Sequence, residues 1–142
     1  MYKKGKSINW GTPPTLYEEL NKEFNFDFDP CPFQPEFDGL TIAWGERNFV
    51  NPPYDSIKPW AKKCRKEQKK GRLSVFLIPA RTSALYFHKY VLPYAEIRFI
   101  KGNLKFIDLD ACTLFKYIMH IQTITNIRPC DKHFLGFLIS KK

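Results

Sequence analysis

The run Asn51-Pro52-Pro53-Tyr54 combines residue types that can activate a planar amine for methyl transfer. Such an amine is a poor nucleophile because its lone pair is delocalised into the attached ring or carbonyl group. Two fixed acceptors, the Asn51 side-chain oxygen and the Pro52 backbone carbonyl, would bind the amine hydrogens and favour a tetrahedral nitrogen. The prolines hold the carbonyl direction rigidly, and Tyr54 can lie flat against a flipped heterocycle. The pattern predicts a catalytic loop, although a four-residue match also occurs in ordinary proline-rich turns.

The segments around this loop alternate between helical and strand patterns. The predicted elements are a helix over 15–24, a strand over 24–28, a strand over 48–50, a helix over 57–70, a strand over 73–79, a helix that Thr82 caps with Leu85, Tyr86 and Tyr90 on its buried side, and a strand over 96–100. Residues 114–124 fit a helix and a strand equally well. The apolar run 73–79 is typical of a strand covered on both faces. This alternation predicts a three-layer, Rossmann-like α/β domain with a mostly parallel sheet, whose ligands lie at the carboxyl ends of the strands.

The chain has 142 residues, enough for one domain, and a formal net charge of +9 at pH 7. Such a surplus attracts polyanions, so nucleic acid is the first partner to consider, although solvation alone also explains a basic surface. The helix over 57–70 has one apolar stripe and an otherwise basic surface. The candidate contacts to a nucleic-acid backbone are Lys62, Lys63, Arg65, Lys66, Lys69, Lys70 and, after the strand over 73–79, Arg81.

The four cysteines lie far apart and form no Cys-x-x-Cys pair; they are Cys31, Cys64, Cys112 and Cys130. This spacing argues against a zinc site. The charged N-terminus is unlike a signal peptide, and no apolar run reaches the ~18 residues of a membrane span. We therefore expect reduced thiols in a soluble cytoplasmic protein of a bacterial or phage-infected cell, without metal or membrane, as a monomer or weak dimer.

Several motifs in a fixed order resemble the phage-type DNA N-6-adenine methyltransferase (Dam) family. They are Trp10-Gly11-Thr12-Pro13-Pro14, Phe26-Asp27-Phe28-Asp29-Pro30-Cys31, Asp38-Gly39-Leu40, Trp44 and Phe49-Val50-Asn51-Pro52-Pro53-Tyr54. The resemblance covers residues 10–106 and implies an S-adenosylmethionine-dependent enzyme that methylates adenine in double-stranded DNA at a specific site. We expect a basic, flexible tail over 1–9, a methyltransferase core over 10–106, and a divergent segment over 107–142 that completes or caps the same domain.

The resemblance also implies roles for individual residues. Catalysis falls to Asn51, Pro52, Pro53 and Tyr54, and cofactor binding to Trp10, Thr12, Pro13, Asp29, Pro30 and Asp38. On local grounds Trp10 could equally be a core aromatic residue, Thr12 a helix cap and Asp29 a turn former.

Two alternative functions stay open. The same loop serves enzymes that methylate an RNA adenine or a protein glutamine amide, although a protein substrate would not require so basic a helix. A catalytically inactive nucleic-acid-binding remnant also fits the sequence. Asp29-Pro30-Cys31-Pro32-Phe33 stands where many methyltransferases have a glycine-rich turn, and no familiar motif follows Phe106.

Overall fold

The structure is a computed structural model, and it describes residues 11–101, residue 104 and the backbone of residues 119–124. Its elements, in chain order, are α1 (Pro14–Phe24), β1 (Arg47–Val50), α2 (Ile57–Lys69), β2 (Leu73–Pro79), the π-helix η1 (Phe87–Val91), β3 (Glu96–Phe99) and β4 (Met119–Ile124). These bounds confirm the predicted helices over 15–24 and 57–70 and the predicted strands over 48–50, 73–79 and 96–100. For residues 119–124 the structure decides in favour of a strand. The expected boundaries of the core, at residues 10 and 106, lie outside the described residues.

The four strands form one sheet in the order β1-β2-β4-β3. β1 pairs with β2 in parallel, whereas β4 is antiparallel to both β2 and β3. The described sheet is therefore mixed, and the expected parallel pairing is present only between β1 and β2. Because β2 and β3 are both antiparallel to β4, strands β1, β2 and β3 all point the same way. Their carboxyl ends share one edge of the sheet, which we call the carboxyl edge.

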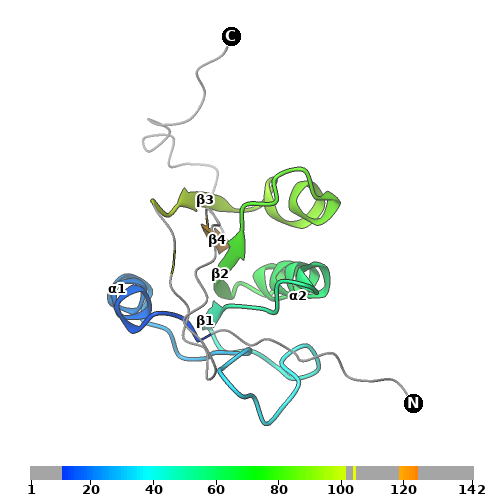
Figure 1. The fold of residues 1–142 in the computed structure, drawn as a ribbon. Coiled ribbons are helices and arrows are strands. Elements are labelled where there is room, and N and C mark those ends of the chain that lie inside the picture. Colours follow the sequence, from blue (N-terminus) through cyan, green and yellow to red (C-terminus); the bar gives the residue numbers. More distant parts are fainter. Residues whose placement is uncertain (1–10, 102–103, 105–118, 125–142) are drawn as a thin grey trace, which may run out of the picture.

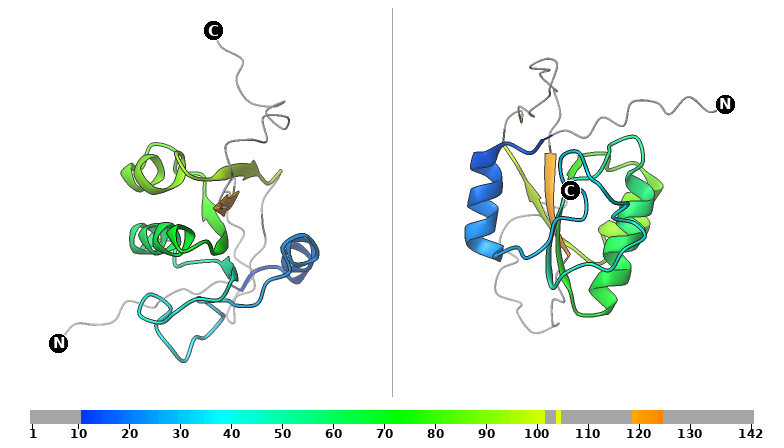
Figure 2. Two further views of the ribbon diagram at one scale, coloured as in Figure 1. Left: turned by 180° about the vertical axis from the view of Figure 1, so that it is seen from behind. Right: turned by 90° about the horizontal axis from the view of Figure 1, so that it is seen from below.

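Helices cover both faces of this sheet. Figure 1 shows α1 on one face and α2, with the helical turn of η1 beside it, on the other, and Figure 2 shows the same arrangement from two further directions. In β2, Val75 and Leu77 pack with Leu20 of α1, while the alternate residues Phe76 and Ile78 belong to the core on the α2 face. The expected burial of β2 on both faces is confirmed, because all residues from Ser74 to Pro79 are buried.

Local sequence explains where the two α-helices begin and end. Pro14 occupies the start of α1, where a missing backbone N–H needs no partner, and Asn25 ends the helix in the left-handed conformation with φ 50°. Gly71 follows α2 with φ 86°, a conformation that glycine adopts without a Cβ clash. Each helix in the described part of the chain is too short or too polar to cross a membrane.

The predicted strand over 24–28 is wrong, because only Phe28 forms a β-bridge, with Asn48 of β1. The Asp27 carboxylate accepts hydrogen bonds from the backbone N–H groups of Glu46 and Arg47, at 3.1 and 3.0 Å. The backbone N–H groups of Asp27 and Phe28 both donate to the Arg47 carbonyl. A side chain thus takes up donors that a regular ladder would use, and the segment runs beside β1 without joining the sheet as a strand.

The helix predicted to start at Thr82 is also corrected. The helical element is the π-helix η1, and no side-chain hydrogen bond caps it. Because a π-turn is wider than an α-turn, the residues that face the sheet differ from those that an α-helix with 3.6 residues per turn would place there. Phe87 and Val91 are buried, Tyr86 and Tyr90 pack partly against the core as predicted, and Leu85 is 74% exposed.

Candidate active site

The loop Asn51-Pro52-Pro53-Tyr54 begins directly after Val50, the last residue of β1, at the carboxyl edge. Asn51 and Pro52 are buried, and Pro53 and Tyr54 are half-buried. The Tyr54 ring packs against the core clusters on both faces of the sheet. The loop is therefore held by the strand before it and by the two cores beneath it.

Two hydroxyl groups bind the Asn51 side chain. The Asn51 Nδ2 donates to Thr12 Oγ1 at 3.1 Å, and the Tyr54 hydroxyl donates to Asn51 Oδ1 at 3.0 Å. Burial raises the pKa of Tyr54 far above its ordinary value, so this hydroxyl stays protonated and can serve as a donor. Thr12 is not the helix cap that the local sequence allowed, because Pro13 is the N-cap of α1 and no side chain caps that helix.

The backbone carbonyl groups of the loop differ in their partners. The Pro53 carbonyl accepts from the Ser56 N–H at 3.2 Å, and the Tyr54 carbonyl accepts from Arg81 Nη1 at 2.9 Å. Among the described residues, no donor binds the carbonyl of Pro52. The acceptor capacity of Pro52, the carbonyl that the sequence singled out, is thus not used within this part of the chain.

A pocket of about 400 Å³ lies beside Asn51, between the start of α1 and the carboxyl end of β1. Its lining residues are Gly11, Thr12, Pro14, Tyr17, Asp29, Cys31, Phe33, Phe49 and Asn51. The structure therefore brings together Thr12, Asp29 and Asn51, three residues that the sequence predicted for the site. The volume of the pocket is in the range of small-molecule sites, roughly 300–1,000 Å³.

Asp29 contributes a largely buried carboxyl group to this pocket. Burial raises its pKa to about 6, and the Cys31 backbone N–H, which donates to Asp29 Oδ1 at 2.8 Å, offsets part of the shift. No basic side chain in the described ranges forms an ion pair with Asp29. The same hydrogen bond shows that Asp29 is also a turn former, so its structural and its functional interpretation are compatible.

The other predicted cofactor residues lie differently. Pro13 and Pro30 are adjacent in sequence to lining residues but are not part of the lining themselves, and Trp10 lies outside the described residues. Asp38 is exposed, and its carboxylate binds the Leu40 backbone N–H at 2.9 Å in a local turn. The structure does not bring Asp38 to the pocket.

Sequence reasoning assigned no role to the other six lining residues, namely Gly11, Pro14, Tyr17, Cys31, Phe33 and Phe49. Phe33 is 41% exposed, and Phe49 is fully buried at the carboxyl end of β1. Tyr17 lies one turn into α1 and could have been found as the aromatic residue that follows Thr12-Pro13-Pro14 at helical spacing. Cys31 and Cys64 are free and buried, and Cys112 and Cys130 lie outside the described residues.

Residues 2–116 match the sequence profile of the family described as DNA N-6-adenine-methyltransferase (Dam). The chain belongs to the Dam family. No curated protein and no solved structure shows a significant match to this chain.

Membership of the Dam family confirms the resemblance inferred from the motifs, and the match extends past residues 10–106 at both ends. It supports DNA adenine methyltransferase activity in general, with DNA as substrate, and implies S-adenosylmethionine as methyl donor. Within the described residues, no three His, Cys, Asp or Glu side chains gather as a metal site requires.

The basic residues predicted to contact DNA are not equivalent in this Dam-family chain. Lys63, Arg65 and Lys70 have partners within the protein: Lys63 donates to the Ile42 carbonyl, Arg65 lies 3.8 Å above the Tyr94 ring, and Lys70 binds the buried Glu67. Lys62, Lys66 and Lys69 are exposed.

Hydrogen bonds from Lys70 and Arg72 hold the pKa of Glu67 below its ordinary value against the effect of burial. Part of the basic face of α2 therefore has a structural role.

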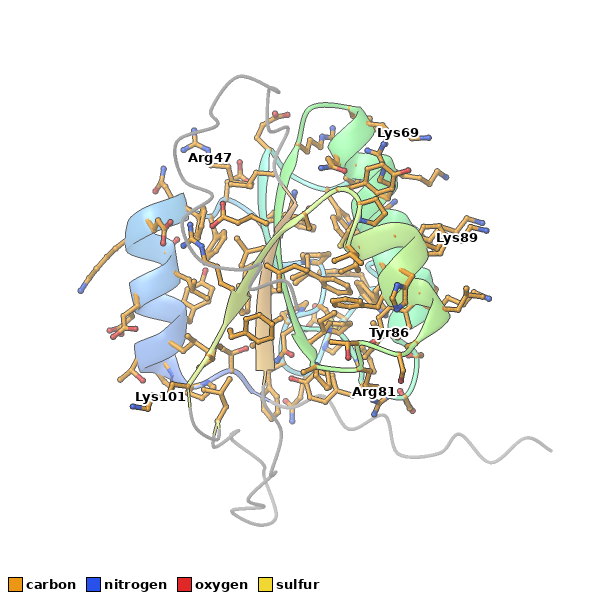
Figure 3. All side chains as sticks on the ribbon, turned by 90° about the horizontal axis from the view of Figure 1, so that it is seen from above. Arg47, Lys69, Arg81, Tyr86, Lys89 and Lys101 are labelled. Atoms are coloured by element: carbon orange, nitrogen blue, oxygen red, sulfur yellow. The ribbon has the colours of Figure 1, made fainter. Side chains whose placement is uncertain are left out.

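The basic residues also differ in the end of the sheet at which they lie. α2 starts at Ile57, near the loop over 51–54, and ends at Lys69, close to the point where β2 begins. Figure 3 shows Lys69 and Arg47 at one end of the molecule and Arg81 and Lys101 at the opposite end. Arg81 and Lys101 follow the carboxyl ends of β2 and β3, so they lie at the same edge as Asn51.

Proposed function

We propose that this chain is a site-specific methyltransferase that transfers a methyl group from S-adenosylmethionine to the exocyclic amine of adenine in double-stranded DNA. The observation that carries the proposal is the place of Asn51, a residue that is 9% exposed, directly after β1 in the wall of the pocket. Family membership supports the reaction in general, and Thr12 and Asp29 line the same pocket as Asn51.

The lining of the pocket fits S-adenosylmethionine. When bound, this cofactor supplies a methyl group on a positively charged sulfur, and it carries an adenine ring and a charged amino acid end. The aromatic rings of Tyr17, Phe33 and Phe49 offer apolar surface for a heterocycle, and the Asp29 carboxylate can bind a cationic amino group or a ribose hydroxyl. A largely buried carboxyl group without an ion pair in the described residues is costly, and a cationic ligand would compensate that cost.

Asn51 and Pro52 are the residues that activate the amine. In our proposal Asn51 Oδ1 and the Pro52 carbonyl each accept one amine hydrogen, so that the nitrogen lone pair is withdrawn from conjugation with the ring. The Pro52 carbonyl binds no other donor among the described residues, which supports this role. Both acceptors are held before the substrate arrives, because Thr12 binds the Asn51 side chain and the two prolines restrict the backbone.

Tyr54 is the residue that holds the flipped base. Its ring is anchored on both core clusters and its hydroxyl on Asn51, so a base that stacks on the ring is placed beside the Asn51 oxygen. Arg81, which donates to the Tyr54 carbonyl, places a positive charge directly next to this loop. We therefore propose that DNA approaches the carboxyl edge, with Arg81 among the phosphate contacts.

A methyl-transfer assay tests the proposal. The full chain is incubated with radiolabelled S-adenosylmethionine and, in separate reactions, with duplex DNA, RNA of the same sequence and a denatured protein mixture. We expect label on the adenine of DNA, identified after digestion to nucleosides, and sequencing of the methylated DNA would then give the target site. Label on RNA adenine or on glutamine would show that RNA or protein, and not DNA, is the substrate. Label on none of the three substrates would overturn the proposed reaction.

A further inference from the structure

We infer that Thr12 is a positioning residue that fixes which end of the Asn51 amide is presented to the substrate. The inference rests on the proposed function and assigns Thr12 a role other than cofactor contact. It starts from one hydrogen bond, in which Asn51 Nδ2 donates to Thr12 Oγ1 at 3.1 Å across 39 residues of sequence.

An amide side chain has two ends of nearly the same shape and opposite hydrogen-bonding character. Amine activation requires the oxygen, because the amine of adenine brings hydrogens and needs acceptors. An Asn51 amide rotated by half a turn would present Nδ2 instead, and two donors would then face each other. The orientation of Asn51 is therefore as important for the reaction as its presence.

The two hydroxyl groups that bind Asn51 favour one orientation. Thr12 lies at Nδ2 and Tyr54 at Oδ1. A phenol is a stronger acid than an aliphatic alcohol and hence the better donor, whereas the alcohol oxygen is the better acceptor. With the phenol at Oδ1 and the alcohol at Nδ2, each group makes the bond for which it is better suited.

The location of Thr12 allows it to hold this orientation. It precedes the N-cap Pro13 of α1, a helix whose Leu20 is anchored in the core, while Asn51 follows β1. The bond thus joins two rigid elements on either side of the pocket, and Thr12 and Asn51 both line its wall. Oδ1 is left on the side of Tyr54, where the flipped base would stack.

The test compares three variants in single-turnover methyl transfer at saturating cofactor and DNA. Thr12→Val keeps the shape of the side chain and removes the acceptor, and we expect the rate to fall about tenfold, the effect of losing one orienting hydrogen bond. Thr12→Ser should restore most of that loss. The matched control is Thr15→Val, which makes the same change at an exposed position of α1 outside the pocket lining and should leave the rate unchanged.

Cofactor affinity, measured by calorimetry with S-adenosylhomocysteine, separates positioning from cofactor contact. We expect the Kd of Thr12→Val to stay within about twofold of the wild type. An unchanged rate in Thr12→Val, or a weaker Kd as the only effect, would overturn the inference.

A second readout does not depend on activity. In a ¹⁵N-labelled chain, the side-chain amide signals of Asn51 are identified by their loss in Asn51→Asp. Their exchange with solvent should become at least about tenfold faster in Thr12→Val and stay slow in Thr12→Ser. Exchange that is unchanged in Thr12→Val would refute the inference even if the wild type methylates DNA. A wild type without transfer activity would refute the proposed function and leave this readout to decide on Thr12.

Discussion

At the scale of a single residue, Asn51 combines burial with the role in amine activation that we propose for it. Each end of its amide has a hydroxyl partner, so its burial carries no penalty for unsatisfied groups. The oxygen has a second lone pair, which can accept a hydrogen bond while the Tyr54 hydroxyl remains bound.

Replacing Asn51 with alanine tests this chemistry directly. Asn51→Ala removes one of two acceptors, and we expect kcat to fall by roughly 10²–10³, the usual effect of removing one preorganised electrostatic group. Duplex DNA affinity, measured by fluorescence anisotropy, should change less than about threefold, because phosphate contacts dominate it. A variant that keeps the wild-type kcat would contradict the proposed role of Asn51.

Asp29 lowers the free energy of unfolding when it is ionised, as the direction of its pKa shift shows. The pKa is raised from 3.8 to about 6 in the folded chain, so the folded state binds the proton more tightly than the unfolded state. The free energy of unfolding therefore falls as the pH rises through the interval between these values, and the penalty is complete above pH 6. A shift of this size corresponds to at most about 3 kcal/mol.

Asp29→Asn removes this charge and keeps an oxygen for the Cys31 N–H. We expect the variant to be more stable than the wild type at pH 7 by up to about 3 kcal/mol, and to show little gain at pH 4, where the wild-type carboxyl is largely protonated. Urea unfolding of both proteins without cofactor, at the two pH values, measures the difference. The same gain at both pH values would show that the buried charge is not its cause.

At the scale of elements, the segment between α1 and β1 shows how a loop without regular structure is held in place. The Trp44 indole N–H donates to the Gly39 carbonyl at 2.7 Å, and the Trp44 ring stacks near Trp60 of α2. Gly39 itself is buried against the Pro30 carbonyl. The loop that carries Asp29 is thereby tied to α2.

Gly39→Ala tests this arrangement. A Cβ at residue 39 would lie 1.8 Å from the Pro30 oxygen and 2.9 Å from Trp60 Cη2, so the backbone near Asp29 must move. We expect a loss of stability of roughly 1–3 kcal/mol, as for other overpacked sites, with a weaker affinity for S-adenosylhomocysteine. Chemical unfolding and calorimetry measure the two effects, and wild-type values in both would show that the loop tolerates the extra methyl group.

At the scale of the whole molecule, positive charge is present at both ends of the sheet, while Asn51 and the pocket beside it lie at the carboxyl edge. Lys58, in the first turn of α2, and Lys101, after β3, are exposed at the carboxyl edge. Lys69 is exposed at the far end of α2, about 16 Å from Lys58 along a helix that rises 1.5 Å per residue. Removing one lysine charge at each end in turn can therefore show which end of the sheet binds the DNA.

Lys58→Ala and Lys101→Ala should each weaken duplex DNA binding and reduce the slope of log Kd against log salt by about 0.9, the value for one lost phosphate contact. Lys69→Ala, the matched control on the same helix as Lys58, should change both quantities much less. Fluorescence anisotropy over a series of salt concentrations measures the slopes. A larger effect of Lys69 than of the other two would place the DNA along the basic half of α2, as the charge pattern of the sequence alone predicts.

Much of the fold could be predicted because its signals are local. The alternation of Val75 and Leu77 with Phe76 and Ile78 defines a strand with two buried faces, and the tertiary structure places a helix layer against each. The strand over 24–28 could not be predicted correctly, because strand formation depends on neighbours distant in sequence. Here the Asp27 side chain takes up the backbone donors of Glu46 and Arg47.

The sequence by itself determined the chemistry of the loop, because the acceptors of Asn51 and Pro52 and the rigidity of two prolines are properties of the residues in any fold. The tertiary structure decided what surrounds that chemistry. It brings Thr12 to the Asn51 amide, places Asp29 in the pocket while Asp38 stays in an exposed turn, and separates Lys69 from the carboxyl edge. These are contacts and separations between distant segments, and they depend on how the helices pack on the sheet.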